Sequence, residues 1–447
     1  MRSPRPSILL LLLFIIAPTI AAFHPNHSRR ITTHLSAITS SRRDVFHRGV
    51  SAAVAIVAGG ANNIANADDN INPKQLYNQR FPTLFDPLYG QGIRRTIKRQ
   101  LGPNVWSLEQ NLQLGPLQTP LRCVVVQLEG NGGLWVHAPL APTTEFFELL
   151  ESCGSGVVKE IVVPSYALEH KVFVRDAIER WPAAKLWTSP GQFAFPVRSI
   201  SSDFVFGRDV DGVLSTTSDQ DGVSNNNSIP AWVDEIQYET LAAGTFNIAG
   251  TETTFYETAF FHKKSKSLIV TDAVTKIGTT VPELNDSDLL LLVSKRSTSD
   301  PQPDDTPEQQ LIGWEKTALL VSYFFPEHED PDPNNKFVVT WTPGWHDNFQ
   351  MLSDRLIVPP VVRTLLYAQN PERVKEWVDR VSNRWEFEQI IPAHFEAPIK
   401  ASPEEFKRTF AFLENDTQDA FPAADLARGL KPISDLALGS NRKLKVR

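Results

Sequence analysis

The first half of the chain alternates short apolar runs with helix-like segments. The runs are separated by the turn Gly130–Gly133, by a segment that Thr143 or Thr144 can cap, and by a helical pattern that stops before Pro182. Short apolar runs bounded by Gly and Pro are typical of buried strands. Because strands and helices alternate, the pattern predicts an α/β layered fold. The predicted strands are 104–109, 122–128, 134–137, 157–163 and 185–188, and the predicted helices are 143–150 and 172–181.

The second half returns to strand patterns and then becomes mainly helical. Two strand-like runs lead through a lysine-rich turn to Leu268–Thr271, which predicts a hairpin ending at Asp272. Acidic, proline-rich stretches surround an apolar segment between residues 281 and 337, and we interpret this region as an insertion. The other predicted elements are strands at 232–241, 253–262 and 387–391 and helices within 351–368, 372–385 and 403–413.

The first 67 residues carry three successive targeting patterns. The apolar run Ile8–Ile16 predicts a signal peptide over residues 1–22. Residues 23–67 join a transit-peptide composition to a twin-arginine pattern at Arg42 and to an Ala-Asn-Ala cleavage pattern. This order resembles the bipartite presequences of secondary plastids and predicts delivery to the thylakoid lumen. A single secretory signal followed by a linker is the alternative.

The charge of the remaining body excludes one class of partner. The first 67 residues hold seven arginines and one acid, so 37 of the 44 basic and 50 of the 51 acidic residues lie after them. A body this acidic predicts no nucleic-acid partner. It also has no apolar run long enough to predict a transmembrane segment. Cys123 and Cys153 are the only cysteines, too few for a disulfide framework or a cysteine-rich zinc site.

A loop directly after the predicted strand 157–163 carries the strongest chemical signal. Its sequence, from Ser165 to His170, matches a degenerate metal-binding loop of the form H-x-H-x-D-H. Ser165 and Ala167 stand where the first two histidines would be, while Glu169 and His170 keep the acid–imidazole pair. The loop therefore predicts that one metal site is lost and that another is retained.

The order of these parts resembles a known fold. Strands, a loop ending in acid–His, a hairpin ending at Asp272 and the late segment Ile390–His394 are similar to the metallo-β-lactamase fold. More narrowly, Asn104–Trp106, Leu134–Pro139 and Phe260–His262 resemble the plant, algal and cyanobacterial family called domain of unknown function 4336. The resemblance implies a four-layer αββα sandwich over residues 77–413, with the acidic insertion at about 281–337 and a C-terminal tail at 414–447.

The resemblance also implies a ligand set. Hydrolases of this fold hold two metals, and Ser165, Ala167 and the region near Thr254 lack the three histidines of the first site. The second site is implied at Glu169, His170, Asp272 and His394, with Asp272 also implied as the base that orients a water. Two imidazoles and two carboxylates suit one zinc, iron or manganese ion. If the site is degenerate, no cofactor is expected.

Structural roles remain open for the same residues. Glu169 can cap the helix that follows it, His170 can bond to backbone, and Asp272 can bond to loop amides. His394 can be a satisfied polar residue at a strand end. His137 can either support the site or lie buried and backbone-bonded. The sequence thus predicts either a mononuclear hydrolase of small esters, thioesters or phosphoesters, or a non-catalytic protein that binds an assembly partner through its cleft or its tryptophan-rich segments. It does not specify the small-molecule substrate or the protein partner.

Overall fold

The computed structural model describes residues 72–80, 92–192, 205–215, 229–248, 251–324, 326–335, 338–414 and 421–430. The targeting patterns predicted for residues 1–67 lie outside these ranges. Within them, no helix is both long and apolar enough to cross a lipid bilayer.

The first sheet has seven strands in chain order. It changes from antiparallel to parallel pairing at β6, because helices begin to connect the strands there. β4 and β5 form a long hairpin in which Leu108 lies opposite Cys123 and Glu109 opposite Arg122. The strands are β3 (Ile97–Gly102), β4 (Val105–Leu114), β5 (Leu117–Gln127), β6 (Leu134–His137), β7 (Val158–Val163), β8 (Lys185–Thr188) and β9 (Gly212–Val213).

The second sheet has five strands in the order β10-β11-β12-β17-β18. The pair β12 and β17 is parallel although more than a hundred residues separate them in the chain, and the other pairs are antiparallel. The bounds are β10 (Ile236–Ile248), β11 (Thr251–His262), β12 (Ser267–Ile269), β17 (Gln389–Ile391) and β18 (Ile399–Lys400).

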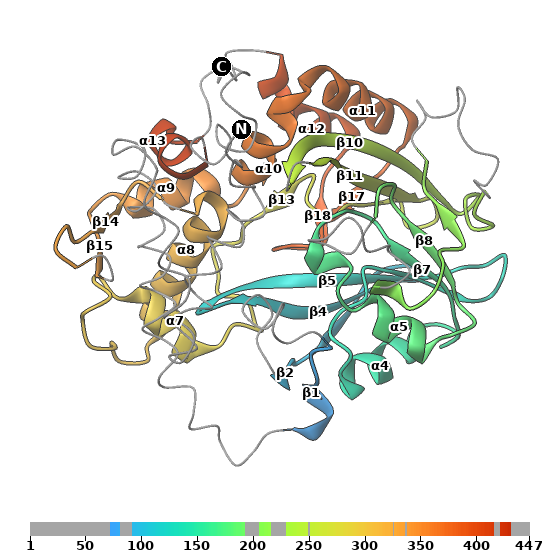
Figure 1. Ribbon diagram of the computed structural model, residues 1–447, viewed down its shortest axis with the longest axis horizontal. Coiled ribbons are helices and arrows are strands. Elements are labelled where there is room, and N and C mark those ends of the chain that lie inside the picture. The colour runs from blue at the N-terminus through green and yellow to red at the C-terminus, as the bar shows by residue number, and fades with distance from the viewer. Residues whose placement is uncertain are drawn as a thin grey trace, which may run out of the picture.

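Side-chain alternation along the strands produces four layers. On β6, Trp135 faces the second sheet and packs in a core shared by both sheets, whereas Val136 faces the helices outside the first sheet. The outer helices are α4 (Thr144–Glu151) and α5 (Val174–Arg180) on the first sheet, and α10 (Pro360–Leu365), α11 (Pro371–Arg384) and α12 (Pro403–Thr409) on the second. Figure 1 shows these helices on opposite sides of the two sheets. The predicted αββα sandwich is confirmed.

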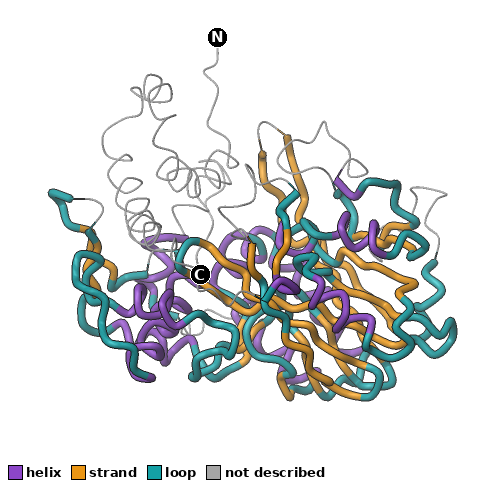
Figure 2. The backbone as a smooth tube through the Cα atoms, turned by 90° about the horizontal axis from the view of Figure 1, so that it is seen from below, coloured by secondary structure: helices purple, strands orange, loops and turns teal. Residues whose placement is uncertain are grey.

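The predicted insertion forms a helical lobe beside the sandwich. It contains α7 (Ser287–Ser294) and α8 (Pro307–Tyr323). The lobe also includes α9 (Trp345–Leu352), which lies beyond the predicted end of the insertion at about 337, and its apolar core takes in Phe421 and Leu430 from the tail. Figures 1 and 2 show this lobe at one end of the molecule and most strands at the other. The remaining elements are β1 (Leu76–Tyr77), β2 (Gly92–Ile93), β13 (Thr275–Lys276), β14 (Glu329–Pro331), β15 (Val339–Trp341), β16 (Leu356–Ile357), α13 (Ala423–Asp425) and short 3-10 or π turns at Pro73–Gln75, Leu168–His170, Tyr367–Gln369, Ala411–Leu413 and Leu426–Leu430.

A buried acid in this lobe predicts a pH-dependent stability. Glu329 on β14 is buried and neither carboxyl oxygen has a hydrogen-bond partner. Burial raises its pKa to about 8, although Arg428 and Lys316 oppose the shift. The folded state therefore holds a proton that the unfolded state releases near pH 4.3, so Glu329 stabilises the fold below that pH and the benefit is lost as the pH rises to 8. We expect Glu329→Gln to increase the free energy of unfolding at pH 8 by on the order of 3 kcal/mol and to change it little at pH 5.

Chemical denaturation of parent and variant at pH 5, 6.5 and 8 checks this expectation. A difference between parent and variant that is the same at all three values would contradict it.

Candidate metal centre

The loop after β7 brings Glu169 and His170 to the edge of the first sheet. His170 lies in a single 3-10 turn, is fully buried, and neither ring nitrogen has a hydrogen-bond partner. Glu169 is partly exposed, and neither that turn nor α5 has a side-chain cap. The alternatives of Glu169 as a helix cap and of His170 as a backbone-bonded residue are therefore wrong.

Asp272 and His394 follow the two parallel strands of the second sheet. Asp272 comes three residues after β12 and His394 three residues after β17, so both lie at the same sheet edge. Asp272 Oδ2 is 3.4 Å from His170 Nε2, and Asp272 Oδ1 is 3.3 Å from His394 Nε2. One donor atom from each of the four predicted residues lies within 4.8 Å of the others. The structure thus brings the whole predicted set together.

The tautomer of His394 is fixed by a backbone carbonyl. His394 Nδ1 lies 3.2 Å from the Pro120 carbonyl oxygen, which can only accept, so Nδ1 carries the proton and donates. Nε2, on the other side of the ring, lies 3.3 Å from Asp272 Oδ1. This is the arrangement in which a histidine is ready to bind a metal ion.

Charges within the cluster keep Asp272 ionised. Burial opposes its ionisation, but His170 and His394 beside it hold the pKa of Asp272 below its usual range. Burial likewise disfavours the charged form of His170, yet Asp272 raises the pKa of that imidazole above its ordinary value. A carboxylate between two imidazoles is therefore available as a ligand or as a proton acceptor at neutral pH.

The donor set fits one divalent ion. Donors on a tetrahedral ion with bonds of about 2.1 Å are about 3.4 Å apart. His170 Nε2 and His394 Nε2 lie at 3.4 and 3.3 Å from the two different oxygens of Asp272, and the four donors together lie within 4.8 Å, so an ion would draw them closer. A fully buried imidazole without a hydrogen bond is otherwise costly, and coordination would satisfy it. Two nitrogen and two oxygen donors suit zinc, iron or manganese.

The positions that correspond to the first metal site carry side chains other than histidine. Ser165 is buried and its hydroxyl accepts from the Ala167 amide, so neither residue offers an imidazole there. Ser165 lies opposite Glu257 of β11, a residue that the sequence analysis missed. Glu257 is buried and accepts hydrogen bonds from the Thr271 amide (2.8 Å) and hydroxyl. Burial and the nearby Asp272 raise its pKa to about 8, so a neutral carboxylic acid lies next to the cluster at pH 7.

His137 is a buried aromatic neighbour of the centre. Its ring packs against Trp135 (centroids 5.6 Å apart) and Phe260 (5.5 Å), and neither nitrogen has a partner outside its own residue. Burial, with a smaller effect from His170, lowers its pKa to about 3. His137 is therefore neutral and is not held by another residue's backbone.

Fold and site together define the class of this protein. An αββα sandwich with an acid–imidazole cluster at the shared ends of its sheets is a metallo-β-lactamase-like protein. The family model described as domain of unknown function (DUF4336) matches residues 103–412, and the chain belongs to this family. The resemblance seen in the sequence is confirmed in both respects.

Other comparisons give only distant similarity. A metallo-β-lactamase from Pontibacter korlensis is 11% identical, with a TM-score of 0.31 over 72% of this chain and 100% of that one. The metal-soaked Flv1 flavodiiron core from Synechocystis sp. PCC6803 is 6% identical, with a TM-score of 0.36 over 72% of this chain and 61% of that one. No curated protein matches the sequence. The layers of the sandwich and the family match carry the classification.

Proposed function

We propose that this protein is a mononuclear metal-dependent hydrolase of small esters, thioesters or phosphoesters. The observation that supports the proposal is the convergence of Glu169, His170, Asp272 and His394 on one point, from three loops far apart in the sequence. A divalent ion at this point would lower the pKa of a bound water and polarise a carbonyl or phosphoryl oxygen. The loss of the first site limits the protein to a single ion.

The side chains of the cluster would have different roles as metal ligands and as a base. His170 and His394 offer imidazole nitrogens, and the Pro120 carbonyl keeps the His394 ring in one tautomer. Asp272 is ionised and contacts both imidazoles, so it can bind the ion with one oxygen and accept a proton from a water with the other. Glu169 adds the fourth donor from the partly exposed side of the cluster.

Removal of the proposed base tests the activity. The full chain would be supplied with zinc, ferrous iron or manganese and assayed on small esters, thioesters and phosphoesters. We expect Asp272→Asn to reduce kcat/KM at least about 100-fold, because the amide neither accepts the proton nor carries the negative charge. Asp354→Asn is the matched control, since Asp354 is well exposed and its ion pair among the described residues is with Lys276. No turnover with any of the metals, or full activity in Asp272→Asn, would refute the proposal.

A non-catalytic role is the second candidate. Its support is the site beside the cluster, where Ser165 and Ala167 stand in place of metal-binding histidines and the neutral Glu257 lies next to Ser165. In this case the protein would bind a partner, and we keep the thylakoid lumen as its proposed location. Of the three tryptophans predicted as a docking surface, Trp314 and Trp341 are buried, whereas Trp345 is partly exposed and stays a candidate.

A further inference from the structure

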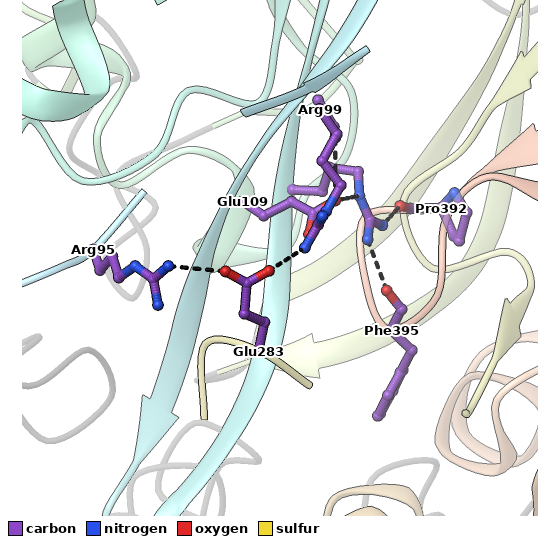
Figure 3. Close-up of polar contacts among 8 residues, drawn as sticks. Arg95, Arg99, Glu109, Glu283, Pro392 and Phe395 are labelled. Carbon is purple, nitrogen blue, oxygen red and sulfur yellow. Dashed lines mark hydrogen bonds and ion pairs between the residues drawn. The ribbon is translucent and has the colours of Figure 1, made fainter. Parts of the chain in front are cut away.

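A buried arginine on β5 contacts the segment that carries His394. The side chain of Arg122 is only 1% exposed. Its Nε donates to Glu109 Oε1 (3.0 Å), and its two terminal nitrogens donate to the carbonyl oxygens of Pro392 and Phe395 (2.7 Å to Phe395). Its partners Glu109, Pro392 and Phe395 are labelled in Figure 3, where dashed lines mark the polar contacts. The two carbonyls flank His394 on either side in the sequence.

A planar guanidinium fixes both carbonyls at once. Its donors form a rigid fork, so the positions of the Pro392 and Phe395 oxygens are set relative to β5 and to each other. Phe395 has a positive φ of 59°, a conformation that a non-glycine residue adopts only where its surroundings impose it. The backbone around His394 is therefore held in a tight bend by a side chain from the other sheet.

The same strand also orients the His394 ring. Pro120, two residues before Arg122, accepts the bond from His394 Nδ1, and Leu121 forms an isolated bridge with His394. Three consecutive residues of β5 thus fix the backbone bend, the position and the tautomer of one imidazole. Its Nε2 is placed 3.3 Å from Asp272 Oδ1.

Glu109 keeps the arginine in place. It lies directly opposite Arg122 in the hairpin and is almost as deeply buried, so the guanidinium does not have to turn toward solvent for a counter-charge. Glu109 also contacts Arg99 at 3.6 Å, and Arg99 joins Glu283 of the insertion at 2.9 Å, as Figure 3 shows. These outer pairs are about half exposed and add little. The backbone around His394 is held mainly by the buried Arg122–Glu109 pair and the two carbonyls that Arg122 contacts.

We propose that Arg122 is a positioning residue for the metal centre, which sets the place and tautomer of His394 through the backbone on both sides of it. The inference rests on the proposed metal function and deepens it, because it names the residue that prepares one ligand before any ion binds. Neither Arg122 nor Glu109 contributes a donor atom to the cluster.

Zinc affinity of full-length variants is the first test. Arg122→Met removes the fork, and Arg122→Lys keeps the charge beside Glu109 without the planar pair of donors. We expect both to weaken zinc binding at least tenfold in a chelator competition assay. Glu239→Gln is the control, because it breaks the pairs of a fully buried carboxylate on β10 of the second sheet with the partly exposed Arg380 and the exposed Arg384 of α11. The control should stay within twofold of the parent. If Arg122→Met does not fold, Arg122→Lys decides.

The tautomer of His394 in the metal-free full chain is the second test. With ¹⁵N-labelled histidine and a His394→Gln variant to assign the signal, the parent should show protonated Nδ1, and the Arg122 variants should show a mixture of both tautomers. Parent-like zinc affinity in the Arg122 variants would overturn the inference. If the parent binds no zinc, the proposed function fails by itself. The tautomer then decides the inference: a mixture supports it, and an unchanged Nδ1 signal overturns it.

Discussion

The full chain purified without added metal is expected to contain about one equivalent of zinc, iron or manganese, and a His170→Ala, His394→Ala double variant is expected to contain none. These residues supply both imidazoles of the cluster, and the two carboxylates that remain cannot hold a borderline ion tightly by themselves. Elemental mass spectrometry of both proteins gives the result directly. No other substitution is expected to lower the metal content more.

A second double variant shows whether metal content falls because ligands are removed or because any two histidines are removed. His328→Ala, His346→Ala removes two imidazoles that bond to Thr342 and Glu315 in the insertion, outside the cluster. It should keep the full metal content. A parent that is folded and metal-free even after metal is supplied would end the hydrolase proposal in its present form, and a search for lumenal binding partners would then replace it.

The sequence patterns predicted the sandwich because the residues within most of its strands and helices determine their secondary structure. Lys185–Thr188 is the predicted strand to the residue, and Thr143 caps α4 as expected. β4 shows what a local pattern misses. Its strand continues five residues past the predicted end at Glu109, through the polar stretch Gln110–Gln113. Gln110 is buried there because its side chain bonds to Thr96 and to the Ala141 backbone, which no hydrophobic pattern can reveal.

The candidate site was predictable for a related reason. Each of its residues follows a strand that ends at the same edge, so their order along the chain was enough to bring them together. Arg122 and Glu257 were not predictable, because their roles depend on partners chosen by the fold. The two carbonyls that Arg122 contacts are 270 and 273 positions away in the sequence. Glu257 is one acid in an otherwise ordinary strand until Thr271 and Asp272 are placed beside it.

The largest stability effect is expected from Trp232→Ala, which should lower the free energy of unfolding by about 3–5 kcal/mol. Trp232 is fully buried between the sheets, with ring centroids 5.9 Å from Trp135, 6.1 Å from Trp187 and 6.2 Å from Phe260. Two of these rings belong to the first sheet and one to the second, so truncation opens a cavity that neither sheet can close alone. Urea denaturation with tryptophan-independent detection by circular dichroism gives the value.

Two further variants show whether the stability lost in Trp232→Ala comes from the cavity between the sheets. Trp232→Phe should cost clearly less than the alanine change, because a ring still fills most of the volume and the buried indole Nε1 has no hydrogen-bond partner to lose. Met351→Ala, at an exposed position of α9, should stay within about 0.5 kcal/mol of the parent. Equal effects of the phenylalanine and alanine changes at Trp232 would mean that packing between the sheets does not set the stability. His137 packs on the same Trp135 and Phe260 rings and lies close enough to His170 for that residue to lower its pKa. The cavity of Trp232→Ala should therefore also weaken metal binding, whereas Met351→Ala should not.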